Sequence, residues 1–247
     1  MTITVSHDEP GISMIGASFR YGDFTVLDDA DFELPKGGTA VVTGRNGSGK
    51  STFLYICAGL LQPHKGSVML AGHRADAHHP SDLVRYGVRR GFVFQEGGLL
   101  SNMNALGNVE LPLRYHADLL GLSDSEISER SKALLQRVRL RQPDSYALPA
   151  HLSFGNRKRL ALARALATKP NFFFFDDPDV GLDPKTAALV HEILCEHRDN
   201  PEVTMLVATN RDLLIDRLEV PGYVLTEGRL HPKGLEPMMS SRAGPIA

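Results

Sequence analysis

The 247-residue sequence contains no tryptophan and only two cysteines, Cys57 and Cys195. The two cysteines are far apart, without the spacing of a metal site, so we expect buried structural thiols in a reducing compartment. No apolar run approaches the ~20 residues that span a bilayer. Residues 1–10 also lack the basic stretch and apolar core of a secretory signal. We therefore expect a soluble chain whose contact with any membrane goes through a partner.

The sequence also lacks a dominant charge. Its 27 basic and 29 acidic residues leave a net charge of −2, so no electrostatic feature favours nucleic acid as a partner. Hydrophobic residues make up 42% and charged residues 23%, as in an ordinary globular protein. A chain of this length can form one α/β domain with a subdomain and bury a sizeable core.

One short segment matches the phosphate-binding pattern G-x-x-x-x-G-K-[ST] at every required position. An expected strand at 39–43 precedes it and an expected helix at 53–61 follows it, which is the context that the motif requires. Glycines let successive N–H groups point at phosphate oxygens, and the helix start adds positive potential. Lys50 would reach the β- and γ-phosphates, and Ser51 would ligate Mg²⁺. The alternative is a glycine-rich turn that matches by chance. The residues of the segment are Gly44, Arg45, Asn46, Gly47, Ser48, Gly49, Lys50, Ser51 and Thr52.

A second segment ends in two carboxylates. Four phenylalanines, residues 172–175, precede Asp176 and Asp177 and predict a buried strand. A nucleotide-hydrolysing enzyme of this kind needs a strand beside the phosphate loop that delivers a carboxylate to Mg²⁺. Asp176 fits that role, and Asp177 lies where a water-activating carboxylate belongs. The alternative is an ordinary strand with a charged end.

The remaining pattern predicts an α/β protein with a helical insertion. Two early strands, at 12–19 and 25–34, predict a small antiparallel sheet beside the nucleotide core. Ser123 and Glu126 form a capping-box pattern before a helix. Three histidines in a polar stretch favour a solvated loop over a metal site; they are His73, His78 and His79. We assign residues 12–95 and 169–230 to the core with its β-subdomain, 96–168 to the helical subdomain and 231–247 to a loose tail.

Ser153 and Gly155 in the segment LSFGN precede an arginine-bearing helix expected at 157–167, which makes a second anion site. At this point the chain resembles the ATP-binding cassette (ABC) ATPases, whose signature LSGGQ occupies the same place. The resemblance covers residues 12–230. It implies that residues 1–247 form a single ABC ATPase domain with a RecA-like P-loop NTPase core, an N-terminal antiparallel β-subdomain and an inserted α-helical subdomain.

The resemblance also assigns roles to single residues. Tyr21 matches the aromatic residue that stacks on adenine. Gln95 matches the glutamine that senses the γ-phosphate beside the metal and contacts the membrane partner. Asn210 falls where the family has its switch histidine. Ser153 and Gly155 would contact ATP held by a second subunit. The expected cofactors are therefore ATP and Mg²⁺, with Ser51, Gln95 and Asp176 at the metal.

Three positions depart from the family pattern. Phe154 replaces a glycine of the signature, Asp177 replaces the usual glutamate, and Asn210 replaces the histidine. A bulky side chain hinders close approach of the backbone to phosphate. Aspartate has one methylene less reach, and an amide cannot become a cation. We expect good Mg-ATP binding and slow hydrolysis; the alternative is local compensation and normal hydrolysis.

Residues 94–113 resemble the corresponding loop of ATPases from MCE-type (Mla) phospholipid-transport systems, although lipoprotein-releasing and cell-division ATPases share its N-V-x-x-P-L ending. The resemblance implies transmembrane permease subunits, a second ATPase subunit in a homo- or heterodimer, a periplasmic MCE-type lipid-binding protein and a small regulator. It places the chain in the cytoplasm, on the inner face of the inner membrane through the permease. The rivals are a solute importer, a lipoprotein-release ATPase and a non-transport dimerisation switch.

Overall fold

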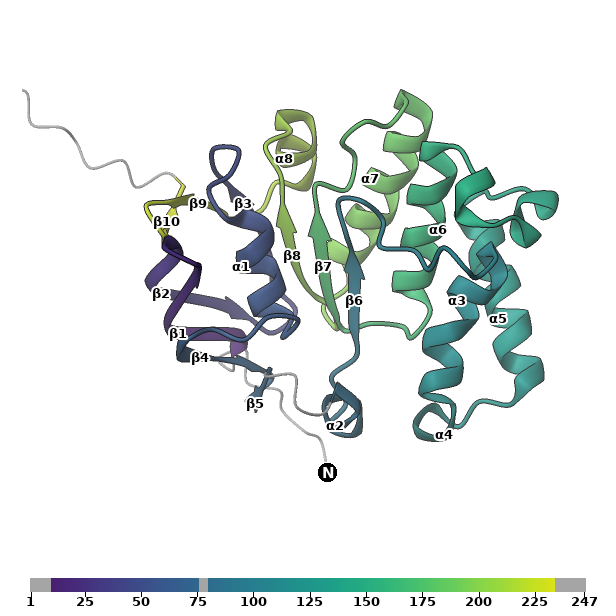
Figure 1. Cartoon of the computed structure of the whole chain (residues 1–247), viewed down its shortest axis with the longest axis horizontal. Helices are drawn as coiled ribbons and strands as arrows, with labels where there is room; N and C mark the ends of the chain where they lie inside the picture. The colour runs from purple at the N-terminus through teal and green to yellow at the C-terminus, as the bar shows by residue number, and fades with distance from the viewer. Residues whose placement is uncertain (1–9, 76–79, 234–247) are drawn as a thin grey trace, which may run out of the picture.

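A computed structural model describes residues 10–75 and 80–233 of the chain (Figure 1). Its centre is a six-stranded sheet in the order β10-β9-β3-β8-β7-β6. The strands are parallel except for β10, which runs antiparallel to β9. Their bounds are β3 Thr39–Thr43, β6 Arg90–Val93, β7 Phe172–Asp176, β8 Thr204–Ala208, β9 Gly222–Thr226 and β10 Arg229–Pro232. The predicted P-loop type of α/β core is confirmed.

Strand β7 shows why this sheet is buried on both faces. Successive side chains of a strand point to opposite faces. Phe173 and Phe175 join one hydrophobic cluster, and Phe172 and Phe174 join the other. Continuous apolar runs are typical of parallel strands covered on both sides. Helices α6 (Phe154–Leu166), α7 (Pro184–Arg198) and α8 (Asp212–Leu218) contribute to the first cluster, and α1 (Lys50–Cys57) contributes to the second.

The small antiparallel sheet that the sequence predicts beside the nucleotide core is present, and it covers α1. Its strand order is β2-β1-β4-β5. Phe53 of α1 meets Phe32 of β2 edge to face, with ring centroids 5.2 Å apart, so α1 lies between the two sheets. The strands are β1 Pro10–Tyr21, β2 Phe24–Pro35, β4 Lys65–Leu70 and β5 His73–Arg74.

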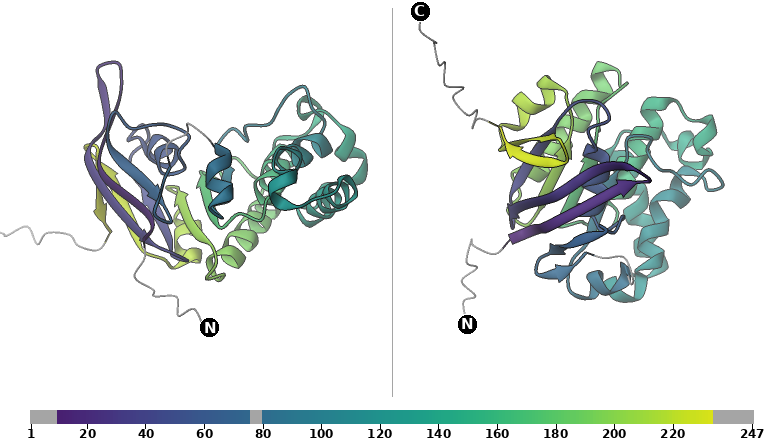
Figure 2. Two further views of the ribbon diagram at one scale, coloured as in Figure 1. Left: turned by 90° about the horizontal axis from the view of Figure 1, so that it is seen from below. Right: turned by 60° about the vertical axis from the view of Figure 1, so that its left-hand side comes forward.

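The insertion between β6 and β7 is helical and forms the opposite end of the molecule from the antiparallel sheet (Figure 2). Helices α3, α5 and α6 pack on one another, and α6 also packs on β6. The capping box at Ser123 and Glu126 is formed. The helices are α3 Ala105–Tyr115, α4 Ala117–Leu120 and α5 Asp124–Arg137, followed by 3-10 turns at Gln142–Tyr146 and Pro149–His151.

The short elements differ most from the sequence-based expectation. Helix α1 begins at Lys50, three residues before the predicted start, because the phosphate loop leads directly into it. The sequence did not predict α2 (Pro80–Arg85), α8 or β10. Elements of four to seven residues contain too few turns or alternations to produce a clear periodicity.

The expected polar loop and free thiols have specific surroundings. His73 stacks on Tyr86, with centroids 4.2 Å apart, while His78 and His79 lie outside the described residues. Among the residues that the structure describes, no group of three His, Cys, Asp or Glu side chains could hold a metal ion.

Cys57 is buried, but Cys195 is only half-buried, so the expectation of two buried thiols is wrong for Cys195. No helix within 10–75 and 80–233 is both long and apolar enough to cross a membrane.

Candidate nucleotide-binding site

The phosphate loop connects the end of β3 to the start of α1, and its shape requires glycine at two positions. Gly49 has φ +99°, and a Cβ there would lie 2.3 Å from Val26 Cγ1. Gly44 has φ +153°, and a Cβ there would lie 2.6 Å from the Leu225 carbonyl oxygen. Any larger residue would therefore push the loop away from the antiparallel sheet or from β9.

Lys50 holds the loop closed from inside. The residue is 7% exposed, and Nζ donates hydrogen bonds to the carbonyl oxygens of Gly44 (2.8 Å) and Arg45 (3.2 Å). These bonds keep the ammonium group within the curve of the loop, next to the first turn of α1. A phosphate group that entered the loop would meet this charge together with the helix N-terminus.

Asp176 ends β7 beside the first turn of α1. Ser51 Oγ donates to Asp176 Oδ1 at 2.9 Å, and the Tyr55 hydroxyl donates to Oδ2 at 3.3 Å. Burial raises the pKa of Asp176 above its ordinary value, and the nearby Asp177 carboxylate adds to this rise. Burial, followed by the charge of Asp176, raises the pKa of Tyr55 to about 12.

The oxygen atoms at this place are suited to bind a magnesium ion. Mg²⁺ prefers hard oxygen ligands such as carboxylates and hydroxyls. Ser51 and Asp176 already bring one of each within hydrogen-bond distance, and Gln95 lines the cavity next to them. Ser51, Asp176 and Gln95 would therefore hold the ion, which when bound supplies positive charge to the phosphates.

The phosphate loop opens into a cavity of about 540 Å³ that collects most of the predicted site residues. Tyr21 is 54% exposed at its edge and pairs across the β1–β2 turn with Phe24, a second exposed aromatic residue. Sequence reasoning missed Phe24, although a second aromatic three residues after Tyr21 was a usable signal. The lining residues are Tyr21, Phe24, Val26, Asn46, Gly47, Gly49, Lys50, Ser51, Thr52, Gln95, Asp177, Val180, Asn210 and Arg211.

Asp177 lies just outside β7 in the left-handed backbone region, with φ +41°. Its N–H donates to the Ala208 carbonyl (2.9 Å), and its own carbonyl accepts from Lys158 Nζ (3.4 Å). Aspartate is one of the few residues that tolerate this backbone conformation. The main chain of Asp177 is thus held on both sides, while the residue faces the nucleotide cavity.

Asn210 follows β8 and touches the phosphate loop directly. Its Oδ1 accepts from the Gly44 N–H at 3.1 Å, and its Nδ2 donates to Asn46 Oδ1 at 3.4 Å. Both ends of the amide are therefore directed at the loop. The sequence separation of 166 residues hid this contact from sequence reasoning.

The signature segment lies elsewhere in the chain. Ser153 caps α6 by accepting from the Asn156 N–H at 3.2 Å. Phe154 is 41% exposed, and its ring lies so close to Gly181 that a Cβ there would be 3.0 Å from it. Neither Ser153 nor Gly155 lines the 540 Å³ cavity. Their expected contact with the ATP of a second subunit stays a prediction.

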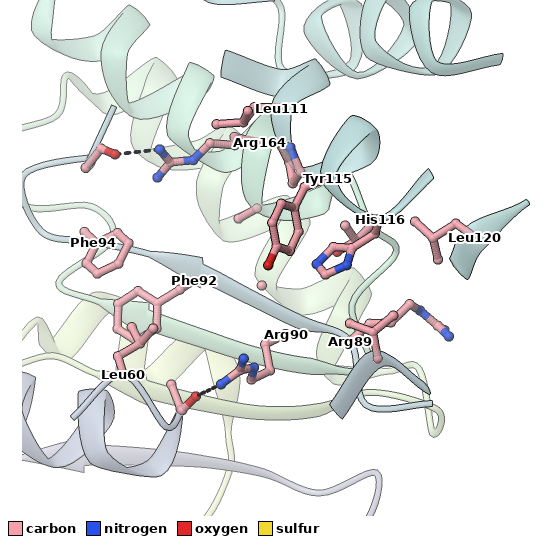
Figure 3. A pocket seen from close by; sticks show the side chains of 17 residues that line it. Leu60, Arg89, Arg90, Phe92, Phe94, Leu111, Tyr115, His116, Leu120 and Arg164 are labelled. Atoms are coloured by element: carbon pink, nitrogen blue, oxygen red, sulfur yellow. Dashed lines mark hydrogen bonds between the residues drawn. The ribbon is translucent and has the colours of Figure 1, made fainter. Parts of the chain in front are cut away.

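A second cavity, of about 460 Å³, lies between the core and the helical insertion (Figure 3). Its wall is mainly apolar and aromatic, but it contains several cationic or titratable groups: Arg89, Arg90, His116 and Arg164. No aspartate or glutamate is among the described residues that line it. Burial lowers the pKa of Arg90 and of Arg164, and burial followed by the charge of Arg90 lowers that of His116.

Comparison with known proteins places these features in a family context. Residues 27–180 match the family described as "ABC transporter". The lipoprotein-releasing system ATP-binding protein LolD of Shewanella oneidensis is 35% identical over 213 residues, which cover 84% of this chain and 90% of that protein. The probable ribonucleotide transport ATP-binding protein mkl of Mycobacterium leprae is 33% identical over 199 residues; these cover 81% of this chain but only 56% of that protein.

A solved structure shows the same fold. The dimeric, post-hydrolysis state of an ATP-binding cassette bound to ADP and Pi superposes with a TM-score of 0.80 at 27% identity, over 91% of this chain and 99% of that one.

Proposed function

Because the chain belongs to the ABC transporter family of ATP-binding cassette ATPases, we propose that it is the ATPase subunit of a multi-subunit membrane transporter. The observation that carries the proposal is the single cavity that gathers the phosphate loop, Gln95, Asp177 and Asn210, with Asp176 bonded to Ser51 at its base. Each group comes from the end of a different strand, at one edge of the parallel sheet, where ligands bind in open α/β folds.

In this proposal different residues of the site contact different parts of Mg-ATP. Tyr21 stacks on the adenine, and the loop N–H groups with Lys50 bind the phosphates. Asp177 orients the attacking water. Ser153 and Gly155 close on the ATP of a second copy or a related subunit, so that ATP binding joins two cassettes and hydrolysis separates them.

We propose that hydrolysis is slow. Asp177 carries its carboxylate one methylene closer to the backbone than glutamate would, and that backbone is held by Ala208 and Lys158. A misplacement of about 1 Å can lower a rate on the order of 10²-fold. Asn210 has its amide bonded to Gly44 and Asn46 and cannot supply a positive charge.

Measurement of nucleotide binding and single-turnover hydrolysis by the purified chain tests this. We expect Mg-ATP to bind and turnover to stay well below the ordinary enzymatic range of about 1–10² s⁻¹. Turnover within that range, alone or with the membrane partner, would contradict slow hydrolysis while leaving the ATPase assignment intact. Failure of ATP to bind would contradict the site itself.

The cavity in Figure 3 is the surface that we propose for the permease. Partly buried guanidinium groups, with no acid among the described residues that line the cavity, favour an anionic partner. An amphipathic cytoplasmic helix with apolar anchors and a glutamate or aspartate would satisfy both the apolar wall and the arginines. Arg164 also donates to the carbonyls of Gly97 and Gly98, just after Gln95, so an occupant would contact the residue that holds this loop.

Tyr115 projects into this cavity and provides a test (Figure 3). Tyr115→Ala should reduce co-purification of the permease by about tenfold or more, because a buried interface aromatic often carries over 1 kcal/mol. Tyr146→Ala is the matched control, since Tyr146 is also exposed but does not line the cavity. Equal permease recovery with both variants would place the docking surface elsewhere.

For the cargo we propose a lipid, moved between membranes by an MCE-type system. The support is the likeness of residues 94–113 to the loop of such ATPases. Purification of the native complex, with identification of its subunits and extraction of bound lipid, tests it. A permease with a lipid-binding MCE protein supports the proposal. A solute importer or a lipoprotein-release permease would replace it, and a soluble dimer without a permease would favour a regulatory switch.

A further inference from the structure

Arg211 lines the nucleotide cavity, and its only ion pair within the described residues is a long one. It follows Asn210 and lines the same cavity as Lys50, Gln95 and Asp177. Its backbone is fixed, because its N–H donates to Thr209 Oγ1 (3.1 Å) and its carbonyl accepts from the first turn of α8. Its side chain is 52% exposed, and its guanidinium group makes no hydrogen bond to the described part of the chain. The side chain can therefore reorient while its Cα stays in place.

The nearest acid to this guanidinium is Asp179, with Nε–Oδ2 3.9 Å apart. Asp179 is only 1% exposed; its Oδ2 is 2.8 Å from His191 Nε2, and its Oδ1 is buried without a hydrogen-bond partner. A buried carboxylate with an unsatisfied oxygen attracts a nearby cation. The distance is nevertheless too long for a hydrogen bond, so this ion pair holds Arg211 only loosely.

A triphosphate that bound in this cavity would attract a second cation besides Lys50. Asn210 cannot provide it, because an amide carries no charge and both of its ends contact the phosphate loop. Arg211 is the next residue, is always charged and presents several N–H donors that match phosphate oxygens.

We propose that Arg211 leaves Asp179 when ATP binds and contacts the terminal phosphate, supplying the positive charge that Asn210 lacks. This inference rests on the proposed ATP site. It makes Arg211 a residue that discriminates ATP from ADP, since ADP has no terminal phosphate for it to contact. It also links the occupied cavity to Asp179, which lies in the loop between Asp177 and Gly181.

The test compares the affinities of the full chain for Mg-ATP and Mg-ADP. Arg211→Ala should lower the ratio of ATP affinity to ADP affinity by on the order of tenfold or more, the value of a charge-assisted hydrogen bond. Arg211→Lys should retain part of the preference for ATP over ADP. Arg217→Ala, which removes an equal charge from an exposed position on α8, the helix that follows Arg211, should leave it unchanged.

An unchanged ratio in Arg211→Ala would overturn the proposal, as would an equal loss in Arg217→Ala. Parallel thermal melts identify a folding defect, and a folded Arg211→Gln variant then repeats the comparison without the charge. If the wild-type chain bound neither nucleotide, the proposed ATP site would be wrong. If it bound both, and the ratio of ATP affinity to ADP affinity did not change with substitutions at position 211, only the role of Arg211 would be wrong.

Discussion

Asp177 combines a constrained backbone with a short carboxylate side chain. Its backbone turns in the left-handed region directly after β7, where its N–H still pairs with Ala208 of β8. Aspartate suits this conformation better than glutamate, which lacks its tolerance of positive φ. The backbone conformation at position 177 therefore favours aspartate, whereas the longer side chain of glutamate would reach further toward an attacking water.

The first prediction is that Asp177→Glu combined with Asn210→His raises the single-turnover rate by about tenfold or more. The longer acid reaches further toward the water, and an imidazole restores a group that can become a cation at position 210. Asp177→Asn is the control and should abolish hydrolysis while ATP still binds. A double variant no faster than wild type would show that another element, such as Phe154, limits the rate.

Among the elements, the segment between β6 and α3 depends on one buried amide. Asn108 is 0% exposed, accepts from the Leu100 N–H (2.8 Å) and donates to the carbonyls of Leu100 (3.1 Å) and Met103 (3.0 Å). Asn104 caps α3 by accepting from the Gly107 N–H at 2.8 Å. Asn104 and Asn108 therefore have structural roles in holding the loop on α3.

The second prediction is that Asn108→Ala lowers the free energy of unfolding by about 2–4 kcal/mol, because several buried backbone groups lose their partner. Urea unfolding measures the loss, and hydrogen exchange should increase in residues 98–104 before it increases in β7. Asn104→Ala, which removes only a helix cap, should cost about 1 kcal/mol. A loss no larger for Asn108→Ala than for Asn104→Ala would contradict this account.

The free energy of unfolding of the whole molecule also depends on pH. His197 on α7 donates from Nδ1 to the Ile193 carbonyl at 2.7 Å and meets Phe173 edge to face. Burial lowers its pKa from 6.5, and burial likewise lowers that of His116. The folded state therefore binds these protons less readily than the unfolded chain, so acid favours unfolding.

The third prediction is that stability is nearly constant above about pH 6.5 and falls as the pH drops toward about 5. The loss begins when the unfolded histidines protonate and stops growing below their lowered folded-state pKa. Melting temperatures across this range measure it. His197→Asn should melt lower at neutral pH, because it loses ring packing, but with a smaller slope. An equal slope in that variant would assign the pH dependence to other groups.

The sequence alone determined the phosphate loop, the carboxylate strand and the sheet around them. Each of these depends on local rules: glycines where the backbone needs positive φ, apolar runs for covered parallel strands, and serine before a helix. Asp176 could be placed beside Ser51 from the order of the motifs, because parallel strands end at the same edge of a sheet.

Only the tertiary structure decided the remaining contacts of the site. Asn210 forms a hydrogen bond with Gly44, 166 residues away in the sequence, Arg211 lies near Asp179, and the ring of Phe154 lies against Gly181. The cavity lined by Arg90 and Arg164 likewise forms between elements that are distant in the chain. Such contacts depend on how elements pack within a few ångströms, and hydrophobic periodicity specifies which face is buried but not what that face will touch.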